Sequence, residues 1–182
     1  MHVGDIKLAD AANGPGIRMS VFVSGCTIHC PGCFQPQTWD FEFGEEYDDR
    51  MEQYILDELG KPYYSGLTIL GGEPFEESNQ AVLAVLLQKV RERYPRLSLW
   101  MFTGYIYDRD LVPGGRKYTA DTDKILDLLD VLVDGPFMKD KKNLRLRFRG
   151  SENQRILDLK ETRRTGRIMF SSYQEPDKSY RV

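Results

Sequence analysis

Short apolar runs recur along the first 135 residues of the chain, and each is rich in β-branched or aromatic side chains. Each run stops at a glycine or at an Asp-Gly turn, which is typical of a buried strand. A weaker run predicts a last strand at 153–159, whereas 41–47 and 105–120 show no regular pattern. The four main strands are expected at residues 17–24, 67–70, 97–103 and 131–133.

Amphipathic stretches separate these strands. The longest repeats apolar residues at i, i+3 and i+4 and stops at Pro95, with Ser78 as its expected N-cap. Asp49 is expected to cap the first helix, which stops at Gly60. Because helices alternate with strands, the sequence predicts βαβ units and an α/β fold with a mainly parallel sheet. The three helices are expected at residues 49–59, 78–94 and 122–129.

The carboxyl ends of parallel strands lie at one edge of a sheet, where folds of this class bind their ligands. Four motifs follow strands directly, so we expect them to converge on one opening. They are Cys26, Gly71-Gly72-Glu73, Thr103-Gly104-Tyr105 and Asp134-Gly135-Pro136. With 182 residues the chain suits a single domain, 1–182, with a polar and loose tail from about residue 171. A complete eight-unit barrel needs about 250 residues, so a partial β/α barrel is expected.

Charge is distributed unevenly over this fold. The net charge is −3, which does not favour a nucleic-acid partner. Residues 136–182 hold 13 Lys or Arg against 6 Asp or Glu, so the remaining residues, 1–135, carry −10. The basic end is interpreted as a solvated surface, or as one that docks an acidic partner or pairs with internal carboxylates. No apolar run is long enough to span a membrane and no signal-peptide pattern is present, so a cytoplasmic protein is expected.

The three cysteines of the chain follow the spacing Cys-x3-Cys-x2-Cys, as Cys26, Cys30 and Cys33. An odd number so closely spaced argues against disulfides and favours metal binding. Thiolates suit iron–sulfur clusters or zinc. A four-iron cluster normally takes four thiolates, so three would leave one iron open, as a catalytic site requires. Zinc held by the cysteines together with His29 or His2 is the alternative.

A second motif, Gly71-Gly72-Glu73-Pro74, follows the second strand. Glycines let the backbone approach a ligand closely, and Glu73 could balance the charge of a ligand amine. A Gly-Gly turn with an acidic residue is also common as plain structure, so this motif alone does not indicate a function.

Taken together, these motifs resemble the radical S-adenosylmethionine superfamily. Within it, the chain is most similar to the glycyl-radical activating enzymes that serve anaerobic ribonucleoside-triphosphate reductase. The resemblance covers approximately residues 10–157. Besides the cysteines and Gly71-Gly72-Glu73-Pro74, it is carried by residues 13–18, 21–25, 38–39, 102–105, 131–137 and 149–155.

The resemblance implies that Cys26, Cys30 and Cys33 hold one 4Fe-4S cluster and that S-adenosylmethionine binds the remaining iron. The glycine turn would hold the amine of S-adenosylmethionine, and the residues around the third cysteine would lie along it. The implied cofactor-binding residues are Gly32, Cys33, Phe34, Gly71, Gly72 and Glu73.

The resemblance also implies the reaction. The reduced cluster would cleave S-adenosylmethionine to a 5′-deoxyadenosyl radical, which takes a hydrogen atom from a glycine in the large subunit of the reductase. No catalytic residue beyond the cluster ligands is required, and the electron donor would be of the flavodoxin or ferredoxin type. A glycyl radical enzyme of the formate-lyase type as the target, or a non-catalytic zinc-binding module, remain as alternatives.

Two further features have open roles. Asp134 could order the opening or bind a cation, or it could be an ordinary turn residue before Gly-Pro. Four arginines could contact the partner or the ligand carboxylate, although surface ion pairs are the first expectation for each. They are Arg145, Arg147, Arg149 and Arg155.

Overall fold

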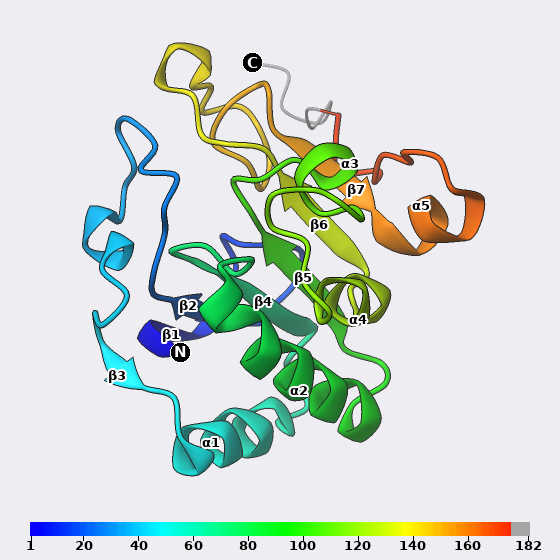
Figure 1. Ribbon diagram of the computed structural model, residues 1–182. Coiled ribbons are helices and arrows are strands. Elements are labelled where there is room, and N and C mark those ends of the chain that lie inside the picture. Colours follow the sequence, from blue (N-terminus) through cyan, green and yellow to red (C-terminus); the bar gives the residue numbers. More distant parts are fainter. Residues whose placement is uncertain (176–182) are drawn as a thin grey trace.

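The computed structural model describes residues 1–175. One seven-stranded sheet organises them, with the strand order β3-β1-β2-β4-β5-β6-β7 (Figure 1). The described residues therefore form an α/β fold around a single sheet. The strands are β1 (His2–Asp10), β2 (Arg18–Val23), β3 (Glu45–Glu46), β4 (Gly66–Gly71), β5 (Ser98–Phe102), β6 (Val131–Asp134) and β7 (Arg155–Asp158).

The centre of the sheet is parallel, as predicted. Strands β2, β4, β5 and β6 pair in this order, and a helix precedes each of the last three. These helices lie together beside the sheet (Figure 1). They are α1 (Asp49–Leu59), α2 (Glu77–Arg93) and α4 (Thr122–Leu128). The shorter elements are α3 (Tyr107–Asp110), α5 (Leu159–Thr165) and two 3-10 turns at Pro36–Trp39 and Lys139–Lys141.

The edges of the sheet are antiparallel, so the expectation of mainly parallel strands holds only for its middle. Strand β1 pairs with β2 and β3, and β7 pairs with β6, all antiparallel. The sequence did not predict β1, because the exposed charged residues Asp5 and Lys7 interrupt its apolar residues. The last strand is shorter than the expected 153–159.

Alternating side chains along the strands separate two apolar layers. In β5, Leu99 and Met101 belong to the main core, which includes α2 residues. Trp100 belongs to a smaller cluster with Val133, and Phe148 packs against it. Because successive side chains of a strand point to opposite faces, both faces of β5 are covered. The smaller cluster lies on the face away from the core helices and is closed by the loop that follows β6.

Arg18 ties the amino ends of three parallel strands together. Its side chain is fully buried and donates to Thr68 Oγ1 at 2.7 Å and to Ser98 Oγ at 2.7 Å. It also donates to the carbonyls of Leu67 and Ser98, both at 2.8 Å, and lies over the ring of Trp100. Burial lowers the pKa of Arg18 to about 10, so the guanidinium stays charged at neutral pH. These bonds fix the ends of the strands opposite to those that carry the sequence motifs.

Two predicted helix starts differ from the structure. Helix α2 is capped by Glu76 and not by Ser78, and the Glu76 side chain makes no capping hydrogen bond. Its carboxylate is instead directed to other partners, described below. Asp48, one residue before the expected Asp49, caps α1 by accepting from the backbone N–H of Met51 at 2.8 Å. The short helices α3 and α5 lie in segments where no helix was predicted.

The expected loose tail, 171–182, falls partly outside the described residues. Within them, the N–H of Ser171 donates to the carbonyl of Ile156 at 2.8 Å. The N–H of Ile156 donates to Gln174 Oε1 at 2.7 Å. Ser171 and Gln174 are therefore bonded to β7. Among residues 1–175, no helix has the length and the apolar composition that crossing a membrane requires.

Candidate functional site

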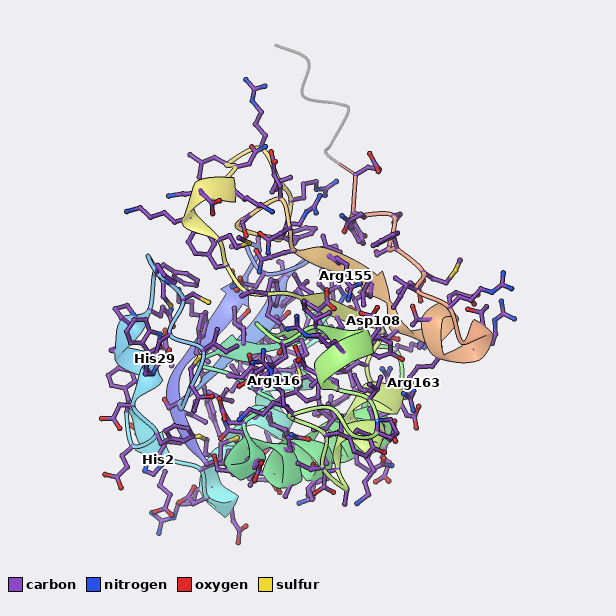
Figure 2. The ribbon with its side chains drawn as sticks, turned by 45° about the horizontal axis from the view of Figure 1, so that its top comes forward. His2, His29, Asp108, Arg116, Arg155 and Arg163 are labelled. Carbon is purple, nitrogen blue, oxygen red and sulfur yellow. The ribbon has the colours of Figure 1, made fainter. Side chains whose placement is uncertain are left out.

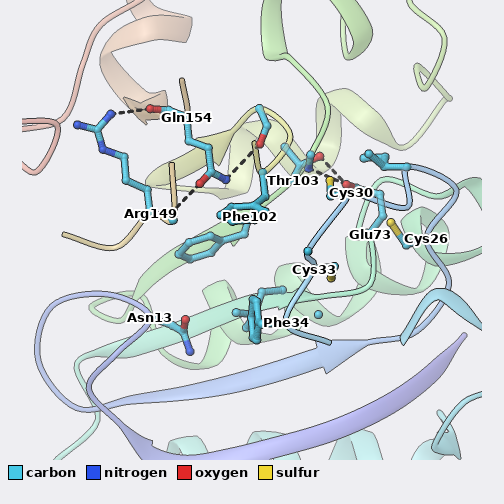
Figure 3. A pocket seen from close by; sticks show the side chains of 18 of the residues that line it. Asn13, Cys26, Cys30, Cys33, Phe34, Glu73, Phe102, Thr103, Arg149 and Gln154 are labelled. Carbon is cyan, nitrogen blue, oxygen red and sulfur yellow. Dashed lines mark hydrogen bonds between the residues drawn. The ribbon is translucent and has the colours of Figure 1, made fainter. Parts of the chain in front are cut away.

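A cavity of about 480 Å³ opens at the carboxyl ends of the parallel strands (Figure 3). Residues that follow β2, β4, β5 and β6 line it, as the convergence of the sequence motifs predicts. Every residue that was expected to hold the cluster or its ligand contributes to the wall. These residues are Cys26, Cys30, Gly32, Cys33, Phe34, Gly71, Gly72 and Glu73.

The cysteine loop is held to the 3-10 turn that follows it. Gly25 has φ +88°, which allows the chain to bend sharply out of β2. The N–H of Gly25 donates to the carbonyl of Thr38 at 2.9 Å, and the N–H of Cys26 donates to the carbonyl of Trp39 at 3.3 Å. The His29 ring stacks on Trp39 with centroids 4.5 Å apart. The loop is thus anchored at its start and middle, with the His29 ring engaged in stacking.

The three cysteines are free thiols beside one cavity. Burial raises the pKa of Cys26 to about 11, and burial also raises the pKa of Cys30. Both are protonated at neutral pH, so binding a metal through the thiolates would release protons. No three His, Cys, Asp or Glu side chains within residues 1–175 are arranged to hold a single metal ion. The soft donors that surround the cavity are those that an iron–sulfur cluster uses.

Gly71 and Gly72 bring the end of β4 against the cysteine loop. Gly71 has φ +111°, and a Cβ added to Gly72 would lie 2.6 Å from the carbonyl oxygen of Gly25. This closeness allows the N–H of Gly72 to donate to the carbonyl of Val23 at 2.7 Å. The N–H of Glu73 donates to the carbonyl of Gly25 at 2.8 Å. The glycines therefore join the two motifs through the backbone.

Glu73 is a buried carboxylate on the cavity wall, only 1% exposed. It accepts from the N–H of Phe75 at 2.9 Å, from Thr103 Oγ1 at 2.7 Å and from the N–H of Gly104 at 2.8 Å (Figure 3). Burial raises the pKa of Glu73 to about 7, although these hydrogen bonds lower it in part. A carboxylate has about four acceptor positions, so Oε2 keeps one for a ligand.

No Lys, Arg or His side chain within the described part of the chain forms a salt bridge with Glu73. A buried carboxylate is costly to ionise without a cation. A cationic group of a ligand that entered the cavity would therefore be stabilised by the Glu73 carboxylate.

A buried network that the sequence did not indicate supports the cysteine loop from below. Glu76 accepts from the N–H of Thr27 at 2.8 Å, from its hydroxyl at 2.6 Å and from the Tyr105 hydroxyl at 3.2 Å. Lys117 donates to the second oxygen of Glu76 at 2.6 Å. Burial raises the pKa of Glu76, but the hydrogen bonds from Lys117 and Thr27 together lower it by more. The pKa of Glu76 therefore lies below its ordinary value.

This network gives a structural role to the irregular segment 105–120. Glu76 could have been noticed as the acidic residue that follows the glycine motif at the start of a helix. Nothing in the sequence connects it to Lys117, which lies 41 residues further along the chain.

The loop that follows β6 forms the opposite wall of the cavity. Lys142, Leu144, Leu146 and Phe148 line it from this side. Phe34, next to Cys33, also lines the cavity and is 79% exposed. The predicted contact of Phe34 with a ligand would therefore form at the edge of the cavity.

Asp134 and Arg155 pair with each other away from the cavity. Arg155 donates to Asp134 through Nε at 2.8 Å and to Asp108 through Nη2 at 2.6 Å. Arg155 and Asp108 lie side by side in Figure 2. The N–H of Tyr107 also donates to Asp134 at 2.8 Å. Asp134 thus bonds to the segments beside the turn, which fits an ordinary structural turn residue, the third of the three roles considered for it.

Arg149 is also engaged internally. It donates to the carbonyls of Gln154 and Gln174, both at 2.6 Å, and its buried Nε has no hydrogen-bond partner among the described residues. Of the four arginines singled out in the sequence, Arg149 and Arg155 therefore hold the fold together.

Comparison with known proteins agrees with this site. Residues 12–157 match the family described as a 4Fe-4S single cluster domain. The chain is 35% identical over 153 residues to the anaerobic ribonucleoside-triphosphate reductase-activating protein of Escherichia coli K12, covering 83% of this chain and 94% of that protein. The identity to the Pasteurella multocida protein of the same name is 40% over 151 residues, covering 81% and 90%. The enterobacteria phage T4 protein of that name is 31% identical over 156 residues, covering 86% and 93%.

The relatives share one name, and each match spans most of both chains. The residues that match the family model, 12–157, include all three cysteines. The chain therefore belongs to the family of anaerobic ribonucleoside-triphosphate reductase-activating proteins and carries a 4Fe-4S single cluster domain.

Proposed function

We propose that this protein is a radical S-adenosylmethionine enzyme that activates an anaerobic ribonucleoside-triphosphate reductase by generating a glycyl radical on its large subunit. The observation that carries the proposal is one cavity lined by three thiols and by a buried carboxylate with no cation partner among the described residues. The name shared by the relatives supports the choice of the reductase as substrate.

In this proposal, Cys26, Cys30 and Cys33 hold a 4Fe-4S cluster and leave one iron for S-adenosylmethionine. When bound, the two groups supply one-electron reductive cleavage of the sulfonium, the chemistry from which a glycyl radical can be produced. The protein contributes binding, orientation and exclusion of water. Cys26 is buried and the other two cysteines are half-buried, so the protein partly shields the three thiols from solvent.

In this proposal the carboxylate of Glu73 binds the ammonium group of S-adenosylmethionine. The backbone carbonyl of Glu73 accepts from Asn79 Nδ2 at 3.0 Å, so the carboxylate is its more available group. Gly71 and Gly72 keep this carboxylate next to the cysteine loop. The residues at the third cysteine, Gly32 to Phe34, would contact the ligand along the rim.

The open sheet suits a protein substrate. Strands β3 and β7 are its two edges, and we infer that the sheet is an incomplete barrel whose unclosed side admits a loop of the reductase. We also infer a single domain, because all strands of the described residues belong to one sheet. A cytoplasmic location and a reductant of the flavodoxin or ferredoxin type complete the proposal.

The test is iron and sulfide analysis of protein prepared without oxygen, combined with a reductive S-adenosylmethionine cleavage assay. The proposal expects about four irons per chain. It also expects methionine release, and a glycyl radical signal in electron paramagnetic resonance after addition of the reductase. A colourless protein with one zinc would refute it in favour of a zinc-binding module. A radical formed only on a formate-lyase-type enzyme would keep the chemistry and change the substrate.

A further inference from the structure

The loop 139–147, called the basic loop below, stands beside the cavity and is strongly cationic. It contains five Lys or Arg and one Asp. The loop projects from the ends of the strands in Figures 1 and 2, on the same side as the cysteine loop. Part of it lines the cavity, through Lys142, Leu144 and Leu146. A cationic segment is thus built into the wall of the proposed active site.

The cations of the basic end, 136–182, fall into two groups among the described residues. In β7 and α5, four cations pair with carboxylates of this chain, namely Arg155, Lys160, Arg163 and Arg164. In the basic loop, four cations have no salt bridge to any residue among 1–175, namely Lys139, Lys141, Lys142 and Arg145. All four are exposed. The positive charge at the cavity is therefore not neutralised within the described chain.

Two exposed apolar side chains lie near these cations. Leu144, in the middle of the basic loop, is 88% exposed, and Phe34 on the other rim is 79% exposed. No other large apolar side chain among the described residues exceeds 55%. Exposed apolar groups rimmed by polar ones mark surfaces for macromolecules. Here the pair flanks the opening of one cavity.

We propose that the basic loop is the docking surface for the reductase, and that the reductase presents to it an acidic segment with an apolar side chain that packs on Leu144. The inference rests on the proposed function, since it names how the protein substrate is held at that site. Complementary charges speed association more than they slow dissociation, whereas a buried apolar anchor slows dissociation.

The experiment measures association and dissociation rates of the large subunit with the full-length protein, prepared without oxygen and loaded with its cluster, between 50 and 500 mM salt. Lys141→Gln/Arg145→Gln is expected to lower the association rate about tenfold at low salt, with the difference fading at high salt. Leu144→Ser is expected to raise the dissociation rate about tenfold at all salt concentrations. Neither Lys141 nor Arg145 lines the cavity, so the double variant leaves the assigned cofactor site intact.

The matched control is Arg50→Gln/Arg96→Gln, which removes two exposed cations with no salt bridge within residues 1–175, on α1 and before β5. This control should bind like the wild type. The docking proposal is wrong if the basic-loop variant associates like the control. It is also wrong if the variant slows only the reduction of the cluster by an acidic electron carrier.

Cleavage of S-adenosylmethionine without the reductase separates the two levels of inference. The proposed function predicts this cleavage in the wild type and at an equal rate in the basic-loop variant. Normal cleavage together with unchanged docking overturns the docking surface alone. A wild type that neither cleaves S-adenosylmethionine nor forms the glycyl radical overturns the proposed function and the docking surface with it.

Discussion

Replacing Glu73 with glutamine is expected to raise the unfolding free energy of the metal-free protein and to weaken the binding of S-adenosylmethionine. The carboxylate is fully buried, and burial raises its pKa from 4.5 to about 7. An acid with a raised pKa binds its proton more tightly in the folded state. Folding stability therefore falls as the pH rises from 4.5 to 7, and the loss is complete above that. Glutamine has the same shape and no charge, so it removes this loss.

The magnitude follows from the pKa and from the three donors. A rise from 4.5 to about 7 corresponds to about 3 kcal/mol of stability lost at pH 8. Glutamine can keep one oxygen for Phe75 and Thr103, but its NH2 group faces the N–H of Gly104. That unsatisfied donor costs about 1–2 kcal/mol. The unfolding free energy of the variant should therefore rise by about 1–2 kcal/mol at pH 8. Its binding of S-adenosylmethionine loses a charged hydrogen bond to the ligand ammonium, which costs about 1.5–3 kcal/mol, or about 10- to 150-fold in Kd.

Urea unfolding of metal-free protein at pH 5, 6.5 and 8 gives the first quantity, and equilibrium binding of S-adenosylmethionine to reconstituted protein gives the second. Glu77→Gln, an exposed substitution in the first turn of α2, is the control and should change neither. The reasoning is refuted if Glu73→Gln is less stable than the wild type at pH 8. It is also refuted if the variant keeps the same decrease in stability between pH 5 and 8.

Three other substitutions test the site. Cys30→Ala should prevent stable assembly of four irons, measured by iron and sulfide analysis, and full S-adenosylmethionine cleavage by this variant would contradict the assigned ligands. Lys117→Met leaves the charge of Glu76 unpaired and should lower the free energy of unfolding by about 3 kcal/mol. Lys117→Arg keeps the charge and should retain most of this free energy. Equal melting curves for the two variants would exclude a stabilising role of the ion pair. Gly72→Ala places a Cβ 2.6 Å from the carbonyl oxygen of Gly25 and should destabilise the protein by about 1–3 kcal/mol in urea unfolding, and a neutral effect would show that the two loops separate easily.

The centre of the fold could be predicted because its strands are buried on both faces. Runs such as 67–70 are then continuously apolar, and the glycines after them mark the strand ends. The edges could not be predicted in the same way. Exposed positions of β1, including Asp5 and Lys7, carry charges, and its pairing with β2 depends on contacts distant in sequence.

The convergence of the candidate site residues could be predicted where they are adjacent in the chain, and it was missed where they are not. The cysteines and Glu73 belong to compact motifs, and the order of the strands was sufficient to place them at one opening. Glu76 and Lys117 meet only through tertiary packing, and the segment that holds Lys117 has no periodic pattern. Whether cations of the basic end, 136–182, form salt bridges also depends on tertiary contacts that cannot be read from the sequence.

The bonds from Thr27 to Glu76, and from Glu76 to Lys117, have a consequence for the order of biogenesis. The loop that carries the cysteines reaches its final shape only after a segment some 90 residues later in the chain has been synthesised and packed beneath it. Such distant contacts form late, since the intervening chain must close first. We therefore expect the cluster to be inserted only after segment 105–120 has been synthesised and packed, and not into the cysteine loop of a shorter nascent chain.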